Sequence, residues 1–95
     1  MTLDLGEIRE QIDALDSQIE KAFEQRMELC ARVAEYKIEH GKAVLDPARE
    51  KEKLDRLNKM AANEFNAHGV TELFTQIMAI SRKLQYRILK ERGKL

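Results

Sequence analysis

Two permanent cations stand on the apolar stripe of a predicted helix. Arg26 and Lys37 belong to the stretch AFEQRMELCARVAEYK, residues 22–37. At about 100° per residue, both fall within about 20° of the centre of the stripe. A buried charge without a partner is costly, and no Asp or Glu of the stripe stands close enough to pair with Arg26. Because guanidinium groups bind carboxylates through paired hydrogen bonds, the pattern indicates a site for an anionic ligand.

Simpler interpretations of these cations stay open on spacing alone. The stem of Arg26 could pack while its head group reaches water, or Arg26 could be a polar residue that sets the register of a helical seam. Lys37 stands near the end of the predicted helix, where water is easier to reach.

The other segments add polar residues to the same inner side. Ser81 lies within an apolar stripe of the last segment, and Gln85 lies at the edge of that stripe. In the simpler interpretation, Ser81 bonds to the carbonyl four residues earlier and Gln85 is half-solvated. The stretch DPAREKE places Asp46 at a helix N-cap, with Arg49 and Glu50 in a first turn that could equally be an ordinary solvated one. This set holds cations and amide donors, one carboxylate and no nucleophile, so it suits a small dicarboxylate whose reaction needs positioning and charge stabilisation.

Composition narrows the functional classes. The 95 residues fit one domain, and 17 basic residues balance 17 acidic ones, which argues against a nucleic-acid-binding protein. No apolar run approaches the roughly 20 residues of a membrane span, and the N-terminus MTLDLGEIRE lacks the pattern of a signal peptide, so a cytoplasmic location is expected. Cys30 is the only cysteine, and His40 and His68 each precede a glycine as residues at helix ends do. We therefore expect no metal site.

Helix-forming residues dominate, and Gly41, Pro47 and Gly69 divide the chain. We predict an all-α fold and a single domain over residues 1–95, with one long helix at 5–40 and shorter helices at 47–65 and 70–91. A heptad-like seam follows the long helix through Ile8, Ile12, Leu15, Ile19, Ala22, Arg26, Leu29, Val33 and Tyr36. That helix would be about 50 Å long, more than a compact chain of this size can cover, so an obligate homodimer is expected.

Five pieces in this order carry a family resemblance: IREQIDALDSQI, the arginine of EQRMEL, VAEYK, DPARE and ISRKLQ. Together they resemble the all-helical (AroQ) class of chorismate mutases, from Ile8 to Leu89. The resemblance implies an intertwined homodimer of three-helix chains, with two active sites that mix residues from both chains. It also implies the concerted [3,3] rearrangement of chorismate to prephenate, a step of the shikimate route to phenylalanine and tyrosine, without cofactor or metal.

The resemblance also implies a role for each matching residue. Arg9, on the flank of its helix, would reach the site of the partner subunit and join Arg26 at a substrate carboxylate. Lys37 and Gln85 would contact the ether oxygen, and Lys37 also a carboxylate. Ser81 would bind the ring carboxylate, Glu50 the ring hydroxyl with help from the backbone N–H of Asp46, and Arg49 would complete the charge arrangement.

Two rivals remain at this point. Isochorismate pyruvate lyases share the fold and most of the cations but look different around the start of the second helix and lack a segment like SRKLQ. A dimeric helical scaffold without catalysis is the other alternative. The intact DPARE and ISRKLQ pieces favour the mutase.

Overall fold

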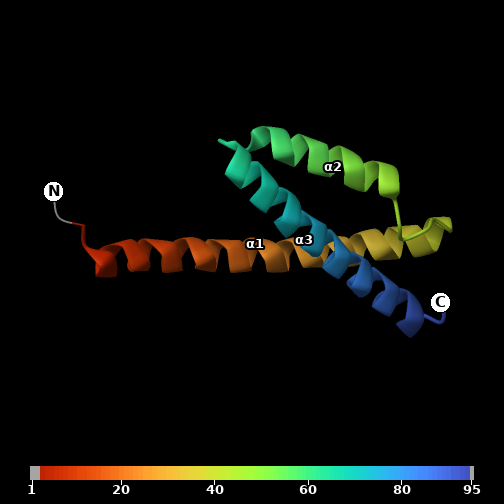
Figure 1. Cartoon of the computed structure of the whole chain (residues 1–95). Helices are drawn as coiled ribbons and strands as arrows, with labels where there is room; N and C mark the ends of the chain where they lie inside the picture. Colours follow the sequence, from red (N-terminus) through yellow and green to blue (C-terminus); the bar gives the residue numbers. More distant parts are fainter. Residues whose placement is uncertain (1–2, 95) are drawn as a thin grey trace.

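The protein is built from α-helices. A computed structural model describes residues 3–94, which form α1 (Leu5–His40), α2 (Pro47–Met60) and α3 (Glu64–Glu91). Figure 1 shows α3 crossing α1, with α2 turned back alongside α3. The all-α fold with one long and two shorter helices is confirmed.

Local chemistry explains the ends of α1. The side chain of Asp4 accepts a hydrogen bond from the backbone N–H of Glu7 at 3.2 Å, which caps the first turn. At the other end Gly41 takes the left-handed conformation, with φ of 62°, and the N–H of Lys42 bonds back to the carbonyl of Lys37 at 2.9 Å. A residue with a side chain adopts that conformation rarely, so Gly41 ends the helix as the sequence predicts.

The predicted boundary between the second and third helices is wrong. α2 ends at Met60, not at residue 65, and α3 begins at Glu64, so Gly69 and Val70 lie inside the helix. Ala61 is extended, and the side chain of Asn63 caps α3 by accepting from the N–H of Asn66 at 2.8 Å. An asparagine cap is a stronger start signal than a glycine, which a helix interior tolerates at a cost of about 1 kcal/mol.

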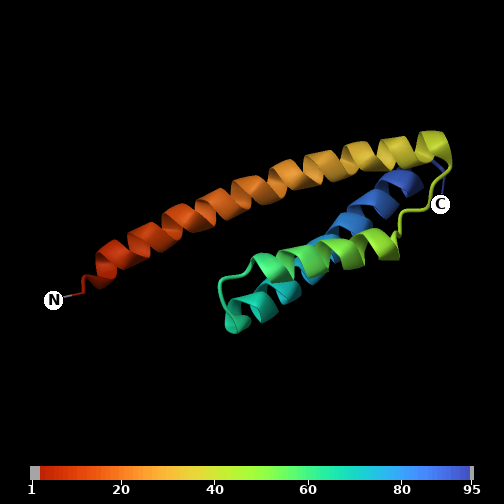
Figure 2. The same cartoon turned by 90° about the horizontal axis from the view of Figure 1, so that it is seen from above.

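α3 is the helix that holds the others together. It packs against both α1 and α2, whereas α1 and α2 do not pack against each other within residues 3–94. Figure 2 shows α3 running from α1, near the C-terminal end of α3, to α2, near the N-terminal end of α3. Few side chains are buried in the described chain: Ala34, Val44, Met78, Ser81 and Gln85. Two of these five are polar, and all but Ala34 line the pocket described below.

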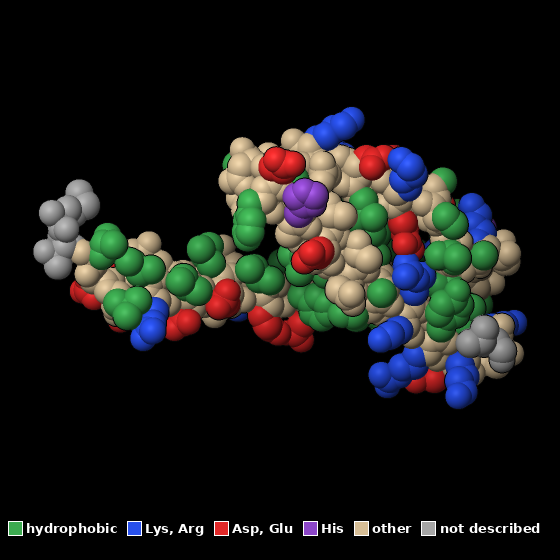
Figure 3. Space-filling view, viewed as in Figure 1, with side chains coloured by type: hydrophobic (Ala, Val, Ile, Leu, Met, Phe, Trp, Pro, Cys, Tyr) green, Lys and Arg blue, Asp and Glu red, His purple; other side chains and the backbone are tan. Residues whose placement is uncertain are grey.

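The molecule is too elongated to form a compact core alone. Its radius of gyration is 17.3 Å and its extents are 61 × 25 × 14 Å, against about 12 Å for a compact chain of this length. The N-terminal half of α1 projects beyond the other helices, and hydrophobic side chains are exposed along it in Figure 3. Ile12, Leu15 and Ile19 are 49%, 56% and 60% exposed.

The predicted seam is also exposed where α1 crosses α3. Leu29, Val33 and Tyr36 are exposed, while Ala34 is fully buried and Met27 half-buried. Ala34 and Met27 lie about 100° around the helix from the seam, so α1 uses a different face to pack on α3. Arg26 lies in the seam, and Lys37 lies about 20° further round the helix, toward the face that packs on α3. None of the three helices in the described residues combines the length and apolarity needed to cross a membrane.

Candidate active site

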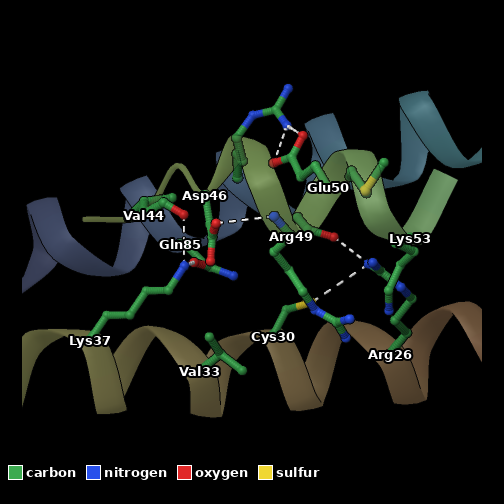
Figure 4. A pocket seen from close by; sticks show the side chains of 13 residues that line it. Arg26, Cys30, Val33, Lys37, Val44, Asp46, Arg49, Glu50, Lys53 and Gln85 are labelled. Atoms are coloured by element: carbon green, nitrogen blue, oxygen red, sulfur yellow. Dashed lines mark hydrogen bonds and ion pairs between the residues drawn. The ribbon is translucent and has the colours of Figure 1, made fainter. Parts of the chain in front are cut away.

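A pocket of about 190 Å³ opens between α1, the connection before α2, the first turns of α2 and the middle of α3. Figure 4 shows its side chains converging from these elements. Thirteen residues line it: Arg26, Cys30, Val33, Lys37, Val44, Asp46, Arg49, Glu50, Lys53, Met78, Ser81, Arg82 and Gln85.

The pocket face of α1 carries residues at intervals of four, three and four. Arg26, Cys30, Val33 and Lys37 therefore share one side of the helix. Arg26 donates from Nη1 to Oγ of Ser81 at 2.5 Å, and the same nitrogen lies 3.6 Å from Sγ of Cys30. This hydrogen bond ties α1 to α3 at one end of the pocket and directs the guanidinium of Arg26 into it.

Ser81 makes two hydrogen bonds, one within α3 and one to α1. Its hydroxyl donates to the carbonyl of Ile77 at 2.8 Å, the local bond of the simpler interpretation, and accepts from Arg26. Because the hydroxyl proton is committed to Ile77, the oxygen is fixed as an acceptor for Arg26. Ser81 is 6% exposed, so the local bond and the inward position occur together.

Lys37 and Gln85 meet at the other end of the pocket. The ammonium of Lys37 donates to the carbonyl of Val44 at 2.7 Å and to Oε1 of Gln85 at 3.4 Å. Gln85 is 7% exposed, which contradicts the half-solvated interpretation of this side chain. With Oε1 accepting from Lys37, the amide nitrogen of Gln85 is left to donate, so two nitrogen donors lie side by side.

The start of α2 contributes the acidic residues. Asp46 caps the helix by accepting from the N–H of Arg49 at 3.1 Å. Both carboxylate oxygens of Glu50 accept from Nη1 of Arg82, at 2.5 and 2.6 Å. Arg49 lines the pocket and lies 4.0 Å from Glu52, with both side chains more than half exposed. A pair so exposed holds Arg49 only weakly, so its guanidinium can turn toward a ligand.

Positive charge is in excess on this pocket. Five cationic side chains line it against two carboxylates, Asp46 and Glu50. Burial, followed by the positive charges of Arg49, Arg26 and Arg56, lowers the pKa of Lys53. Neighbouring like charges disfavour the protonated form of a lysine, and a bound anion would relieve them. The electrostatics therefore favour an anionic ligand.

The structure brings together seven of the eight residues that the sequence predicts for the site. Only Arg9 lies apart: it is exposed in the projecting half of α1, about 25 Å from Arg26 along the helix at about 1.5 Å per residue. It cannot reach the pocket of its own chain. Its donation to a partner subunit stays a prediction.

Two charged lining residues, Lys53 and Arg82, are missing from the predicted set. Lys53 follows Arg49 by four positions, and Arg82 follows Met78 by four, so helical spacing could have found both. They were missed because a charged residue that does not fall on an apolar stripe of its helix usually faces water.

Comparison with known proteins identifies relatives of this chain. The family described as "Chorismate mutase type II" matches residues 8–86. A "Chorismate mutase" of Methanocaldococcus jannaschii is 35% identical over 92 residues, which cover 92% of this chain and 89% of the relative. A "4-amino-4-deoxychorismate mutase" of Streptomyces venezuelae is 34% identical over 71 residues, covering 75% of this chain and 65% of that protein.

A further relative is much longer than this chain. A "Bifunctional chorismate mutase/prephenate dehydratase" of Escherichia coli is 33% identical over 85 residues, 88% of this chain but 22% of that protein. The chain therefore spans about a fifth of the bifunctional protein.

Proposed function

The chain belongs to the type II chorismate mutase family, and we propose that the pocket between α1, α2 and α3 is the site where it converts chorismate into prephenate. The family match and the identity with the Methanocaldococcus jannaschii relative support an isomerase of this kind. The observation that carries the assignment to this pocket is the convergence of Lys37, Gln85 and Arg26 on a cavity with surplus positive charge.

The reaction requires a pocket that positions its substrate. Chorismate carries an enolpyruvyl side chain joined to its ring by an ether oxygen. In one step the bond from that oxygen to the ring breaks while a carbon–carbon bond forms to the ring, so electrons shift around a cycle of six atoms and no group of the protein is bonded covalently. Holding the flexible side chain over the ring removes much of the entropic barrier.

Lys37 and Gln85 supply the charge stabilisation in this proposal. Negative charge grows on the ether oxygen as its bond to the ring breaks. The Lys37 ammonium and the Gln85 amide nitrogen would both donate to that oxygen, and the contact between the two side chains fixes them before the substrate arrives. Donors that are fixed in advance bind the transition state better than the ground state, which accelerates the reaction.

The remaining side chains would bind the two carboxylates and the ring hydroxyl. Arg26 would take the ring carboxylate, and Ser81, on breaking its bond to the carbonyl of Ile77, would donate its hydroxyl proton to the same carboxylate. Lys37 and Arg49 would hold the carboxylate of the side chain. Glu50 would accept from the ring hydroxyl, and the backbone N–H of Asp46 would donate to the oxygen of that hydroxyl.

We further propose that the active protein is an obligate homodimer, with the projecting half of α1 laid against a second copy. The exposed seam of α1 supports this, because apolar residues in such a row need a covering surface. In the dimer Arg9 would enter the pocket of the partner, as the family resemblance implies. The whole chain would form a single domain.

The biological setting follows from the product. Prephenate leads to phenylalanine and tyrosine, so this enzyme would act in aromatic amino acid biosynthesis. A cytoplasmic location remains our prediction, in keeping with the sequence.

One assay tests the proposal against its rivals. The purified protein is incubated separately with chorismate and with isochorismate, and prephenate and pyruvate are measured. Prephenate from chorismate supports the mutase; pyruvate from isochorismate without prephenate from chorismate would establish a lyase instead. A scaffold would produce neither and would show no shift of its melting temperature with a dicarboxylate.

The same assay should be run with a second substrate. The Streptomyces venezuelae relative is named for 4-amino-4-deoxychorismate, in which an amino group replaces the ring hydroxyl at carbon 4. We propose that this chain acts on chorismate in preference to that amine.

A further inference from the structure

The ion pair between Arg82 and Glu50 is an unassigned feature of the pocket. One guanidinium nitrogen of Arg82 donates to both oxygens of Glu50, at 2.5 and 2.6 Å, and links α3 to the first turn of α2. The two side chains are 30% and 26% exposed, so the pair is well shielded compared with the surface pairs of this chain, such as Arg87 with Glu91 at 76% and 62%. Arg82, itself a lining residue, is thus bonded to the carboxylate expected to meet carbon 4 of the ring.

We propose that Arg82 is a specificity-determining residue, which makes the site accept a neutral hydroxyl at carbon 4 of the substrate ring and discriminate against an ammonium there. This inference rests on the proposed function, since Glu50 must face that substituent. It names the group behind the proposed preference for chorismate over its 4-amino analogue.

The argument begins with what Glu50 would do alone. A free carboxylate is a good acceptor for a hydroxyl and a better one for an ammonium, because the second hydrogen bond is assisted by opposite charge. A bare Glu50 would therefore favour the amine, which is protonated at neutral pH. A site with this glutamate and no nearby cation would be expected to prefer the amino compound.

Arg82 reverses that preference by cancelling the charge of Glu50. With both oxygens bonded to a guanidinium, an incoming ammonium gains little net attraction and lies close to a like charge. The hydrogen bond from a ring hydroxyl to Glu50 is weakened much less. A carboxylate has about four acceptor positions, and the guanidinium nitrogen occupies only part of them. The other cations of the pocket add to the repulsion of an ammonium, since they outnumber the carboxylates there.

The alternative is that the pair serves only to hold α2 against α3. A purely structural tie would affect both substrates equally when broken. The discriminating quantity is therefore the ratio of kcat/KM for chorismate to kcat/KM for 4-amino-4-deoxychorismate, which a loss of folded protein does not change.

The test compares three variants with the wild-type protein. Arg82→Gln should shift the ratio toward the amine by on the order of tenfold, since like-charge repulsion at a binding site is removed. Arg82→Lys keeps a cation beside Glu50 and should retain most of the wild-type ratio. Arg87→Gln removes the same charge from a more exposed ion pair on the same helix and should leave the ratio unchanged.

The wild-type protein offers a measurement that needs no variant. Raising the pH through the pKa of the substrate's own amine turns the ammonium into a neutral amine. The ratio of kcat/KM for chorismate to kcat/KM for the amine should therefore decrease. Burial and neighbouring cations lower the pKa of Lys53, and loss of its charge would also weaken the repulsion of an ammonium, so the same pH series is run on Arg82→Gln, where the ratio should change less than in the wild-type protein.

The results separate this inference from the proposed function. An unchanged ratio in Arg82→Gln, an equal shift in Arg82→Lys, or a wild-type preference that does not narrow with pH would overturn the role of Arg82 while chorismate turnover stood. A wild-type protein without chorismate turnover would overturn the proposed function and this inference with it.

Discussion

At the residue scale, the pocket is organised by hydrogen bonds between its own polar groups. Lys37 is held by the carbonyl of Val44 and by Gln85, and Arg26 by Ser81. These bonds fix long side chains that would otherwise lose rotamer freedom on binding a ligand. The arrangement fits a reaction in which positioning and charge stabilisation do most of the work.

Lys37→Ala should reduce kcat by about 10²–10³-fold, the range seen when one donor to a developing negative charge is removed. The ammonium is the one full charge expected at the ether oxygen, so the loss should fall on kcat more than on KM. Steady-state measurement of chorismate decay checks this. Lys59→Ala, an exposed lysine on α2, serves as control, and equal rates in the two variants would contradict the role of Lys37.

Lys53 presents a conflict between stability and binding. Burial and neighbouring arginines lower its pKa, so the folded chain holds this proton less tightly than the unfolded chain does. Between the lowered value and the ordinary one near 10.5, the unfolded state binds more protons, and stability rises with pH in that window. At pH values below that window, the charge of Lys53 lowers the stability of the folded, ligand-free protein.

Lys53→Met should therefore raise the melting temperature of the free protein at neutral pH. It should also raise the KM for chorismate by roughly tenfold, because the dianionic substrate would lose one of the five cations that line its pocket. Thermal melts and kinetics on one preparation measure both. Lys51→Met is the matched control: its exposed partner Asp55 raises the pKa of Lys51 through a hydrogen bond and its charge. A lower melting temperature with unchanged KM in Lys53→Met would refute this account.

The residues of the site differ in how far the sequence could reveal them. Arg26 and Lys37 stood out because a charge near an apolar stripe conflicts with its neighbours. Arg82 and Lys53 gave no such conflict, since each stands beside other charged residues of its own helix. Their inward position depends on how α2 and α3 cross, which periodicity does not specify.

At the element scale, helix ends were predictable where the backbone demanded a particular residue. The left-handed conformation at Gly41 and the fixed φ of Pro47 each mark a boundary in the sequence. The boundary between α2 and α3 lacks such a residue, because Ala61 is simply extended and Asn63 caps by its side chain. Gly69 then misled the prediction, since glycine allows a break without requiring one.

Two glycine substitutions should have opposite effects on stability. Gly69→Ala should stabilise the protein by about 0.5–1 kcal/mol, because the position is helical and an added methyl group meets no atom within 4 Å. Gly41→Ala should destabilise it by about 1 kcal/mol, because φ of 62° strains an alanine. Chemical denaturation of both variants measures the difference, and effects of the same sign would be inconsistent with these helix bounds.

At the scale of the whole molecule, the row of apolar side chains on α1 is exposed, and we propose that a second copy of the chain covers it. The projecting helix, the exposed seam and the distance of Arg9 from its own pocket all fit the proposed homodimer, with a second copy laid along α1. A C2 dimer would apply each contact twice, so each chain would both give and receive an arginine. The overhang could be predicted from helix length and radius of gyration, whereas the crossing of the two copies could not.

Mixing two inactive variants tests whether the site is shared. Arg9→Ala should lose most activity, since each pocket would lack the partner's guanidinium, and Lys37→Ala should lose it for the reason given above. When the two are unfolded and refolded together, each mixed dimer contains one pocket with both Lys37 and the partner's arginine. With about half of the dimers mixed and one of two pockets intact in each, roughly a quarter of wild-type activity should return. Refolding each variant alone is the control, and no recovery in a mixture shown to contain mixed dimers would mean that Arg9 does not cross the interface.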